Sequence, residues 1–473
     1  MHENKTDFRS IDWLSIVIYA LLVSFGWINI YSTQSDTFEI FDFSKKHGIQ
    51  LIWIAIAMMT AIVVMIISNR FYSVFANHIY LFAIALLIFT LLTGIEVHNS
   101  KSWISLGGMR FQPSELAKFA TALCLARLFG SYEFKLNSLK SWTKTILIIV
   151  SPMSLILLQK DWGSALVFTS FLFVLYRQGM SGWALTFIAF AIVLFISSLL
   201  LPLLWIILGI IFITFIIALF TYKKLPLKAA LSAVILFGAG WAYKYFTESE
   251  TEYDILLVAV TAATIVASII YTLIQERKLT KLYFALFFFC STLTVYSVDY
   301  IYDNILSTHH RNRIETMLGI KEDIRDVGYN VYQSKVAIGS GGFYGKGFLQ
   351  GTQTKLSFVP EQSTDFIFCT IGEEWGFVGS FTVILLYGIL LIRMVVLSER
   401  QKIVFSRVFG YCVTSIIFFH FAINIAMTIG FAPVIGIPLP FISAGGSSLW
   451  SFTLLLFVFL KLDSANRRKN YEL

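Results

Sequence analysis

Long apolar runs recur along nearly the whole chain, and they restrict its possible folds more than any other feature. Of its 473 residues, 57% are hydrophobic and only 14% are charged, which is too little polar surface for a soluble globule. Runs of roughly 17–25 apolar residues are long enough to cross a bilayer as helices. The sequence therefore predicts an all-α, polytopic membrane protein.

The apolar runs number about fourteen, and each is predicted to be a transmembrane helix. They cover approximately residues 13–31, 50–68, 76–94, 113–130, 143–159, 162–177, 183–201, 203–221, 227–246, 253–274, 281–301, 364–393, 407–430 and 446–462. The first run has no small-residue cleavage site after it, so we expect it to be retained and not removed as a signal peptide. An even number of spans places both ends of the chain on one side of the membrane.

Basic residues fall mainly in alternate connections between these runs, which is typical of the cytoplasmic side. Those connections carry Arg70, Arg127, Arg177, Lys223 and Arg400 with their basic neighbours. The pattern predicts an N-in/C-in orientation with a large outer loop at 302–363. That loop is itself basic, but long loops are translocated largely regardless of charge.

An acidic residue marks the joint between this outer loop and the next helix. Asp365 lies in the stretch Val359 to Phe368, where polar residues give way to apolar ones. A carboxylate held where water meets lipid costs free energy to desolvate. Asp365 is therefore a candidate for a functional site.

Other acidic and basic residues inside or beside the apolar runs form three groups. Glu115 and Lys118 are three apart on one helix face and are predicted to pair. Asp161 stands in a short outer hairpin, where it either caps the next helix or serves an active site. Glu373 and Glu374 lie about 12–13 Å deeper along a helix than the boundary aspartate. We expect at least one of them to be neutral or paired, with Lys118 a candidate partner.

The outer loop contains a glycine-rich stretch, Ile338 to Gly347, with five glycines in ten positions. Such a backbone bends sharply and can approach a ligand closely. Two interpretations stay open, a loop that cradles phosphate and a flexible connector. The four cysteines lie singly inside apolar runs, so we expect them to be buried core residues.

Several motifs, in order along the chain, resemble signatures of the SEDS family (RodA, FtsW and SpoVE). They are Arg110 to Lys118, Asp161 to Val167, Tyr329 to Gly342, Gly351-Thr352-Gln353, Pro360 to Phe368, Ile371 to Gly376 and Gly436 to Ser448. The Phe-Gln-Pro-Ser-Glu and Gly-Thr-Gln variants are more similar to the RodA branch, which acts in elongation, than to the FtsW branch, which acts in division.

The resemblance divides the chain into four parts. Residues 10–180 and 364–465 correspond to the family's membrane core of about ten helices, and residues 302–363 to its large extracytoplasmic loop. Residues 183–301 are apolar helices that include an inserted block of about four.

The family resemblance implies a peptidoglycan glycosyltransferase of the bacterial cytoplasmic membrane, which polymerises lipid II into glycan strands during cell elongation and cell-shape maintenance. Asp365 would be the general base for the acceptor sugar hydroxyl. The departing lipid pyrophosphate needs positive charge and hydrogen-bond donors. The predicted substrate-binding residues are Lys335, Arg110, Trp103, Lys101, Asp161, Arg311, Arg313 and Lys346, and the predicted structural residues are Glu115, Lys118, Glu373 and Glu374.

The implied partners are lipid II, the elongation machinery and a class B penicillin-binding protein transpeptidase, with no nucleic acid. A separate transpeptidase is expected because the predicted outer loops offer no Ser-x-x-Lys motif. No cluster of metal ligands is evident, which leaves a divalent cation open. The alternatives are a lipid II flippase or other transporter, a scaffold that recruits the transpeptidase, and an FtsW-like division glycosyltransferase.

Overall fold

The computed structural model describes residues 10–34, 41–97, 100–106, 109–131, 138–201 and 327–471, with scattered residues between 205 and 315. The described part is mostly helical, and seven of its helices are long and apolar enough to cross a membrane. The chain divides into two units, one formed by Met1–Met180 with Lys321–Leu473 and the other by Ser181–Ile320.

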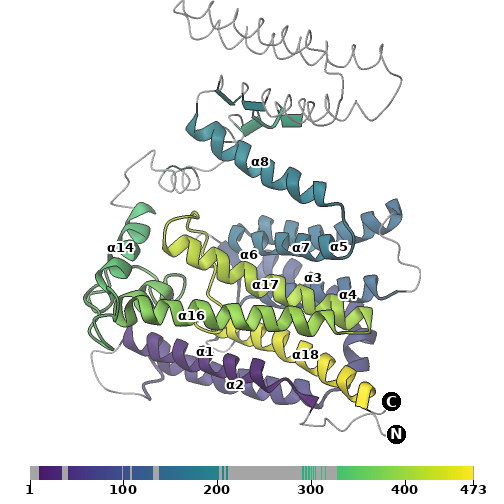
Figure 1. Ribbon diagram of the computed structural model, residues 1–473, viewed down its shortest axis with the longest axis horizontal. Coiled ribbons are helices and arrows are strands. Elements are labelled where there is room, and N and C mark those ends of the chain that lie inside the picture. Colours follow the sequence, from purple (N-terminus) through teal and green to yellow (C-terminus); the bar gives the residue numbers. More distant parts are fainter. Residues whose placement is uncertain are drawn as a thin grey trace, which may run out of the picture. The chain divides into compact units, whose positions relative to one another are not determined.

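The first unit is a helical bundle (Figure 1). Its N-terminal half contains α1 (Trp13–Ser32), α2 (Lys46–Ile66), α3 (Asn69–Thr93), α4 (Pro113–Phe129), α5 (Leu139–Leu158), α6 (Trp162–Val167), the 3₁₀ turn η2 (Phe168–Ser170) and α7 (Phe171–Arg177). Its C-terminal half contains α14 (Val327–Ser340), α15 (Thr352–Lys355), α16 (Ile367–Glu399), α17 (Val404–Thr428) and α18 (Gly446–Tyr471). The two halves interleave, because α16 packs against α1 and α17, and α18 packs against α2.

Ten of the predicted spans overlap helices of the structure. They correspond to α1 to α5, the run α6–η2–α7, α8 (Gly182–Leu200) of the second unit, and α16 to α18. The predicted spans at 203–221, 227–246, 253–274 and 281–301 lie wholly or largely outside the described residues. The total of fourteen spans therefore stays a prediction.

The described part is mostly helical, as predicted, and it adds a short sheet and two helices in connections that were predicted as outer loops. Residues 94–113 contain an antiparallel sheet of β1 (Ile95–Val97), β2 (Ser100–Leu106) and β3 (Met109–Phe111), in that order. The pair Gly107-Gly108 separates β2 from β3 and is a dipeptide that favours tight hairpins. The predicted loop 302–363 also contains the helices α14 and α15.

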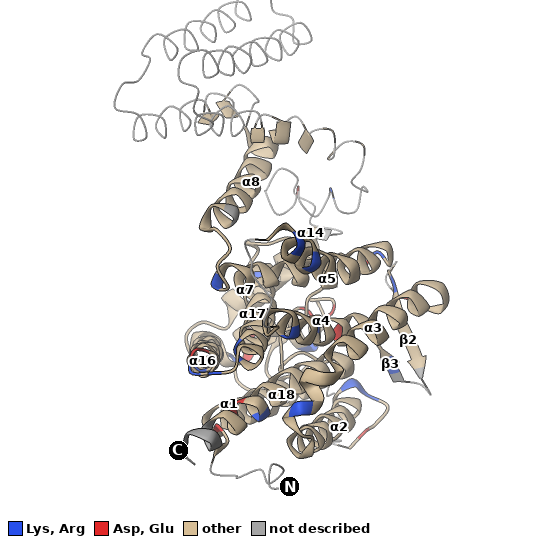
Figure 2. Cartoon of the chain, turned by 90° about the vertical axis from the view of Figure 1, so that its right-hand side faces the viewer, with Lys and Arg blue, Asp and Glu red and all other residues tan. Residues whose placement is uncertain are grey.

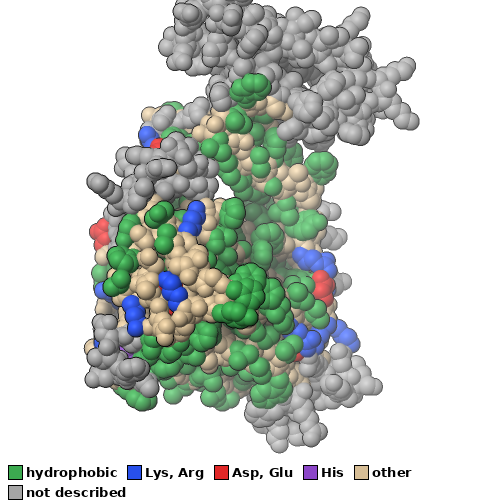
Figure 3. Space-filling model, turned by 60° about the vertical axis from the view of Figure 1, so that its left-hand side comes forward, with side chains coloured by type: hydrophobic (Ala, Val, Ile, Leu, Met, Phe, Trp, Pro, Cys, Tyr) green, Lys and Arg blue, Asp and Glu red, His purple; other side chains and the backbone are tan. Residues whose placement is uncertain are grey.

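The helices of the bundle present apolar side chains to their surroundings. Met59 on α2, Leu81 on α3 and Ile392 on α16 are among the large hydrophobic residues that are more than 60% exposed. Charged residues are sparse along the helices in Figure 2, and hydrophobic side chains cover much of the described surface in Figure 3. Such a surface fits lipid and not water.

Helix α16 is interrupted at Gly376, whose φ of 64° and ψ of −154° are not helical. In a continuous helix, the carbonyls of Glu373 and Glu374 would accept hydrogen bonds from the amides of residues 377 and 378. These carbonyls instead accept hydrogen bonds from the amides of Lys346 and Gly347, both at 3.0 Å, in the glycine-rich loop after α14.

The same loop also satisfies the amides that the interruption leaves without helical partners. The amides of residues 377 and 378 donate to the carbonyls of residues 342 and 343, at 2.9 and 3.1 Å. We call this arrangement, residues 342–347 paired with residues 373–378, the Gly376 junction. Glycine is needed at Gly345, because a Cβ there would overlap the Glu374 carbonyl. The flexible-connector interpretation of the glycine-rich stretch is therefore wrong, since the stretch is bonded into a helix.

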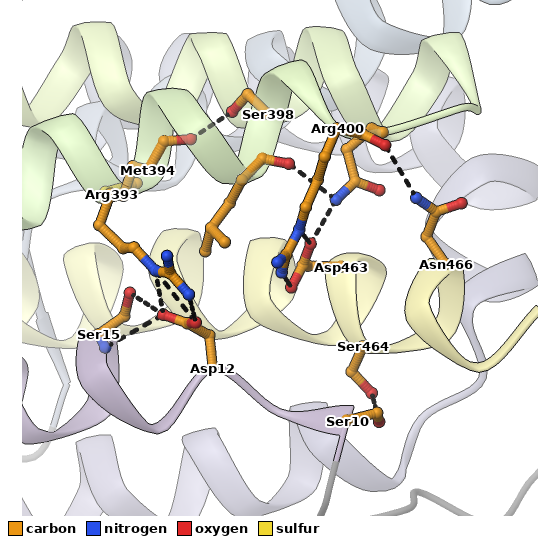
Figure 4. Close-up of polar contacts among 12 residues, drawn as sticks. Ser10, Asp12, Ser15, Arg393, Met394, Ser398, Arg400, Asp463, Ser464 and Asn466 are labelled. Carbon is orange, nitrogen blue, oxygen red and sulfur yellow. Dashed lines mark hydrogen bonds and ion pairs between the residues drawn. The ribbon is translucent and has the colours of Figure 1, made fainter. Parts of the chain in front are cut away.

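The other end of α16 is held by a polar network (Figure 4). Arg393 forms an ion pair with Asp12 at 2.6 Å, and Arg400 pairs with Asp463 near the end of α18. Burial raises the pKa of Asp12, but the hydrogen bonds from Arg393 and Ser15 outweigh this and leave it below its ordinary value. The start of α1, the end of α16 and the end of α18 therefore meet at one end of the bundle, opposite the Gly376 junction.

The Gly376 junction predicts that alanine substitutions at two glycines of α16 will differ strongly in their effect on the stability of the protein. Gly376→Ala should lower the free energy of unfolding by about 1–3 kcal/mol, because alanine is strained at this φ and ψ and its Cβ would meet the Gly342 and Phe343 carbonyls. Gly388→Ala is the matched control, since a Cβ there meets no atom within 4 Å. Thermal unfolding in detergent should show a lower midpoint for the first variant alone, and equal midpoints would contradict the junction.

Candidate functional site

Asp365 lies in a turn of residues 361–366 that leads directly into α16. Its side chain is partly buried. Three successive carbonyls of this turn accept hydrogen bonds from α17 and the segment after it. The donors are the Ala444 amide to residue 363 at 2.8 Å, the Ser443 hydroxyl to residue 364 at 2.6 Å and the Asn424 side-chain amide to residue 365 at 2.8 Å. The backbone around Asp365 is therefore fixed by bonds that do not use its carboxylate.

The Asp365 carboxylate faces the segment that follows α17. A Cβ built on Gly436 would lie 3.4 Å from Oδ2 of Asp365, which is ordinary van der Waals contact. The neighbouring Ile435 carbonyl packs on Gly163 of α6, where a Cβ would come within 2.6 Å of that oxygen. Residues 435–436 therefore contact both the Asp365 turn and the start of α6.

Asp161 caps α6, as one of the two predicted roles requires. Its Oδ1 accepts a hydrogen bond from the Ser164 amide at 3.0 Å, and its Oδ2 accepts one from Gln112 Nε2 at 2.7 Å. Gln112 directly precedes α4, so Asp161 joins the entrances of two helices. Because Gly163 touches Ile435, the Asp161 hairpin and the Asp365 turn contact the same short segment.

Lys335 also reaches this region, from α14. The neighbouring Ser334 donates its hydroxyl to the Thr428 carbonyl at the end of α17, at 2.9 Å. The exposed Lys335 side chain lies against Gly430, where it leaves no room for a Cβ. Lys335 is therefore a cation near the end of the helix that supplies Asn424.

A second cation near Asp365 was not identified from the sequence. Lys46 begins α2, and its ammonium donates to the Ser363 hydroxyl at 3.2 Å and lies 3.8 Å from a carboxylate oxygen of Glu361. Its side chain is 48% exposed, so the charge faces solvent beside the Asp365 turn. In the sequence, Lys46 stands among several charged residues, and no pattern distinguishes it from them.

Three predicted substrate-binding residues lie on the sheet. Arg110 is exposed on β3, and Trp103 is partly buried on β2 opposite Ile95. Lys101 is exposed and donates to the Leu92 carbonyl at 3.1 Å, at the end of α3. The strand β3 leads into Gln112, which connects the sheet to Asp161.

The predicted cations of the outer loop have different positions. Lys346 is part of the Gly376 junction, and its ammonium pairs with Glu373 at 2.7 Å. Arg311 belongs to the second unit, where it donates to the Tyr302 carbonyl at 2.7 Å. Arg313 lies outside the described residues.

Glu373 is a buried acceptor that organises the outer loop. Beside the Lys346 ion pair, its carboxylate accepts hydrogen bonds from the first turn of α15. The donors are the Thr352 hydroxyl at 3.2 Å, the Gln353 and Thr354 amides at 2.9 Å each and the Thr354 hydroxyl at 2.6 Å. A carboxylate at the N-terminus of a helix is favourably placed. Its neighbour Glu374 accepts a hydrogen bond from Ser32 at the end of α1.

The predicted pairing of these glutamates with Lys118 is wrong. The ammonium of Lys118 lies 2.8 Å from Glu115, as the three-residue spacing predicts, and 2.9 Å from Nε2 of His420 on α17. All three side chains are buried. Sequence spacing identifies pairs within one helix but not His420, which is distant in sequence. Within the described residues, no group of three His, Cys, Asp or Glu side chains is arranged to hold a metal ion.

Comparison with known proteins identifies relatives across nearly the whole chain. The family model of the cell cycle proteins FtsW, RodA and SpoVE matches residues 12–225 and 251–468. The peptidoglycan glycosyltransferase RodA of Treponema pallidum is 30% identical, over 96% of this chain and 97% of that protein. The peptidoglycan glycosyltransferase MrdB of Escherichia coli K12 is 29% identical, over 92% of this chain and 87% of that protein.

Solved structures share the fold. A chain of a structure described as the structural coordination of polymerization and crosslinking by a peptidoglycan synthase complex aligns with a TM-score of 0.62 and 21% identity. The alignment covers 96% of this chain and 98% of that one. Between its two matched segments the family model leaves residues 226–250 unmatched, which lie within the predicted apolar helices at 183–301.

The contacts of Glu373 predict that removing the charge of Lys346 lowers the stability of the folded protein. Lys346→Met should lower the free energy of unfolding by about 1–3 kcal/mol, because a buried carboxylate loses a charged donor while keeping its other donors. Lys355→Met is the matched control, since Lys355 is an exposed lysine of the same loop. A Lys346→Met protein that unfolds at the wild-type temperature but binds lipid II more weakly would instead make Lys346 a substrate contact.

Proposed function

Because this chain belongs to the FtsW, RodA and SpoVE family, we propose that it is a peptidoglycan glycosyltransferase that polymerises lipid II during cell elongation, with Asp365 as its general base. The names of the peptidoglycan glycosyltransferases RodA and MrdB support the activity, and the motifs that resemble the RodA branch support its link to elongation. The observation that carries the role of Asp365 is the fixation of its turn by Asn424, Ser443 and Ala444. A general base must be held in one position relative to the proton that it accepts.

In the proposed reaction, the acceptor sugar hydroxyl attacks the anomeric carbon of the donor. The new glycosidic bond forms as the bond from that carbon to the lipid pyrophosphate breaks, and Asp365 accepts the hydroxyl proton. Negative charge accumulates on the pyrophosphate, so cations beside Asp365 stabilise the transition state. Lys335 and Lys46 are suited to this role by their exposed side chains near the Asp365 turn, and Arg110 by its exposed place on β3.

We assign Asp365 to the outer face of the cytoplasmic membrane. After the interruption at Gly376, α16 continues for the 23 residues 377–399, or about 35 Å at 1.5 Å per residue, which is enough to cross a hydrocarbon core of about 30 Å. Asp365 precedes its first residue, whereas Arg393 and Arg400 near its other end meet the ends of α1 and α18. If both chain ends are cytoplasmic, as the basic residues predict, Asp365 faces outward.

A transpeptidase partner follows from the same proposal. The structural relative belongs to a complex that coordinates polymerization and crosslinking. The present chain supplies a polymerisation site, and its predicted outer loops have no acylatable Ser-x-x-Lys motif. A class B penicillin-binding protein would supply the crosslinking.

Asp365→Asn should lower the rate of glycan polymerisation by at least about 10²-fold, because removal of a general base costs about 10²–10⁴-fold. The measurement is strand synthesis by purified protein and lipid II, with the partner transpeptidase present. Glu96→Gln is the matched control, since Glu96 is an exposed carboxylate on β1, and it should leave the rate unchanged. Lipid II binding should persist in both variants.

The same assay separates the alternative functions. A flippase or transporter would make no strands in the wild-type protein while moving lipid II across vesicle membranes. A scaffold would make no strands and would tolerate Asp365→Asn in growing cells. Normal strand synthesis by Asp365→Asn would remove the catalytic assignment.

The cation assignment makes a separate prediction. Lys335→Gln and Arg110→Gln should each slow polymerisation by about 10-fold to 10³-fold, because each removes a positive charge from the developing pyrophosphate. Lys355→Gln, an exposed lysine on α15, is the control and should leave the rate unchanged. An equal effect of all three substitutions would indicate general attraction of an anionic substrate and not a specific contact.

A further inference from the structure

Asn424 is a buried asparagine near the end of the apolar helix α17 (Val404–Thr428). Its side-chain amide donates two hydrogen bonds, to the Asp365 carbonyl at 2.8 Å and to the Ile437 carbonyl at 2.7 Å. Both hydrogens of the NH₂ group are therefore used by backbone carbonyls of two different irregular segments. A buried NH₂ group without acceptors would cost several kcal/mol, so these two bonds satisfy the donors of Asn424, while its Oδ1 has no hydrogen-bond partner among the described residues.

One of the two carbonyls belongs to the segment that carries the Asp365 carboxylate, and the other belongs to the segment that this carboxylate faces. Asp365 carries that carboxylate, and Gly436, next to Ile437, is the residue that its Oδ2 faces. The φ of 74° at Gly436 gives the segment a conformation that other residues rarely adopt. Asn424 therefore fixes the position of Asp365 relative to the backbone that the carboxylate faces.

The same segment also contacts the helix that Asp161 caps. The Ile435 carbonyl packs on Gly163, whose helix is capped by Asp161. One turn earlier on α17, His420 lies 3.2 Å from the Pro438 carbonyl and 2.9 Å from the Lys118 ammonium. A row of polar side chains on α17 thus holds residues 435–438, and Asn424 is the member that also bonds the Asp365 turn.

No other side chain at position 424 would make the hydrogen bonds to the Asp365 and Ile437 carbonyls with the same geometry. Alanine removes both donors, and an ionised aspartate would face two carbonyl oxygens with acceptors of its own. Glutamine keeps both donors but is longer by one methylene, which displaces them by about 1 Å. Active groups must be held within about 0.5 Å of their working geometry, and a misplacement of about 1 Å can cost about 10²-fold in rate.

We propose that Asn424 is a positioning residue for Asp365, which acts by tying the backbone of the general base to the segment at residues 435–437. The inference rests on the proposed role of Asp365. It does not require Asn424 to touch substrate.

The test compares Asn424→Ala, Asn424→Asp and Asn424→Gln with wild type in the polymerisation assay, per amount of folded protein. Alanine and aspartate should lower kcat by about 10²-fold and leave the KM for lipid II within about twofold. Glutamine should recover part of the loss, because it restores the donors. Asn29→Ala is the matched control, since Asn29 is an equally buried asparagine whose side-chain amide bonds the Phe25 carbonyl of its own helix.

A purely structural role for Asn424 would give a different pattern. It would reduce the yield of folded protein and leave kcat per folded molecule near the wild-type value, and that result would overturn the proposal. Should alanine prevent folding, the aspartate variant, which keeps the side-chain volume, carries the same comparison.

A double variant separates this inference from the proposed function. In the Asp365→Asn background, Asn424→Ala should cause less than about a twofold further loss, because no base remains to be positioned. A further loss of about 10²-fold would show that Asn424 acts independently of Asp365. If Asp365→Asn is fully active, the proposed function fails first. If Asp365→Asn is inactive while Asn424→Ala is as active as Asn29→Ala, this inference alone fails.

Discussion

The exchange of backbone hydrogen bonds at Gly376 is the interaction on which the start of α16 and the glycine-rich loop before it depend. A break in α16 leaves two carbonyls and two amides without helical partners, and the loop of residues 342–347 satisfies all four. In lipid, every backbone polar group needs an internal partner, so neither the break nor the loop is stable alone. Their pairing fixes where the loop lies, and the buried Glu373 carboxylate then binds α15 to the same place.

The Asp365 turn follows the same rule ten residues earlier in the chain. Its carbonyls are satisfied by Asn424, Ser443 and Ala444, which belong to α17 and to the irregular segment between α17 and α18. Two irregular segments thus complete each other, and the backbone bonds described above hold the Asp365 turn in one position.

The sequence predicts what depends on local pattern. Apolar runs locate ten described helices, the change from polar to apolar residues locates Asp365, and a three-residue spacing identifies the Glu115–Lys118 pair. It does not predict partners that are distant along the chain. Glu373 pairs with Lys346 and not with Lys118, and Asn424 bonds a residue 59 positions away. A polar residue in an apolar helix signals such a partner, but periodicity cannot say which one.

The large connection between α7 and α14 need not disturb this site. Every contact described above for the Asp365 turn comes from residues 41–50 or 363–445, which belong to the first unit. The chain leaves that unit after Met180 and returns to it at Lys321. If the inserted helices are even in number, as predicted, they also leave α14 to α18 on their original sides of the membrane. A predicted insertion of this kind would add chain without changing the described bonds that hold the Asp365 turn.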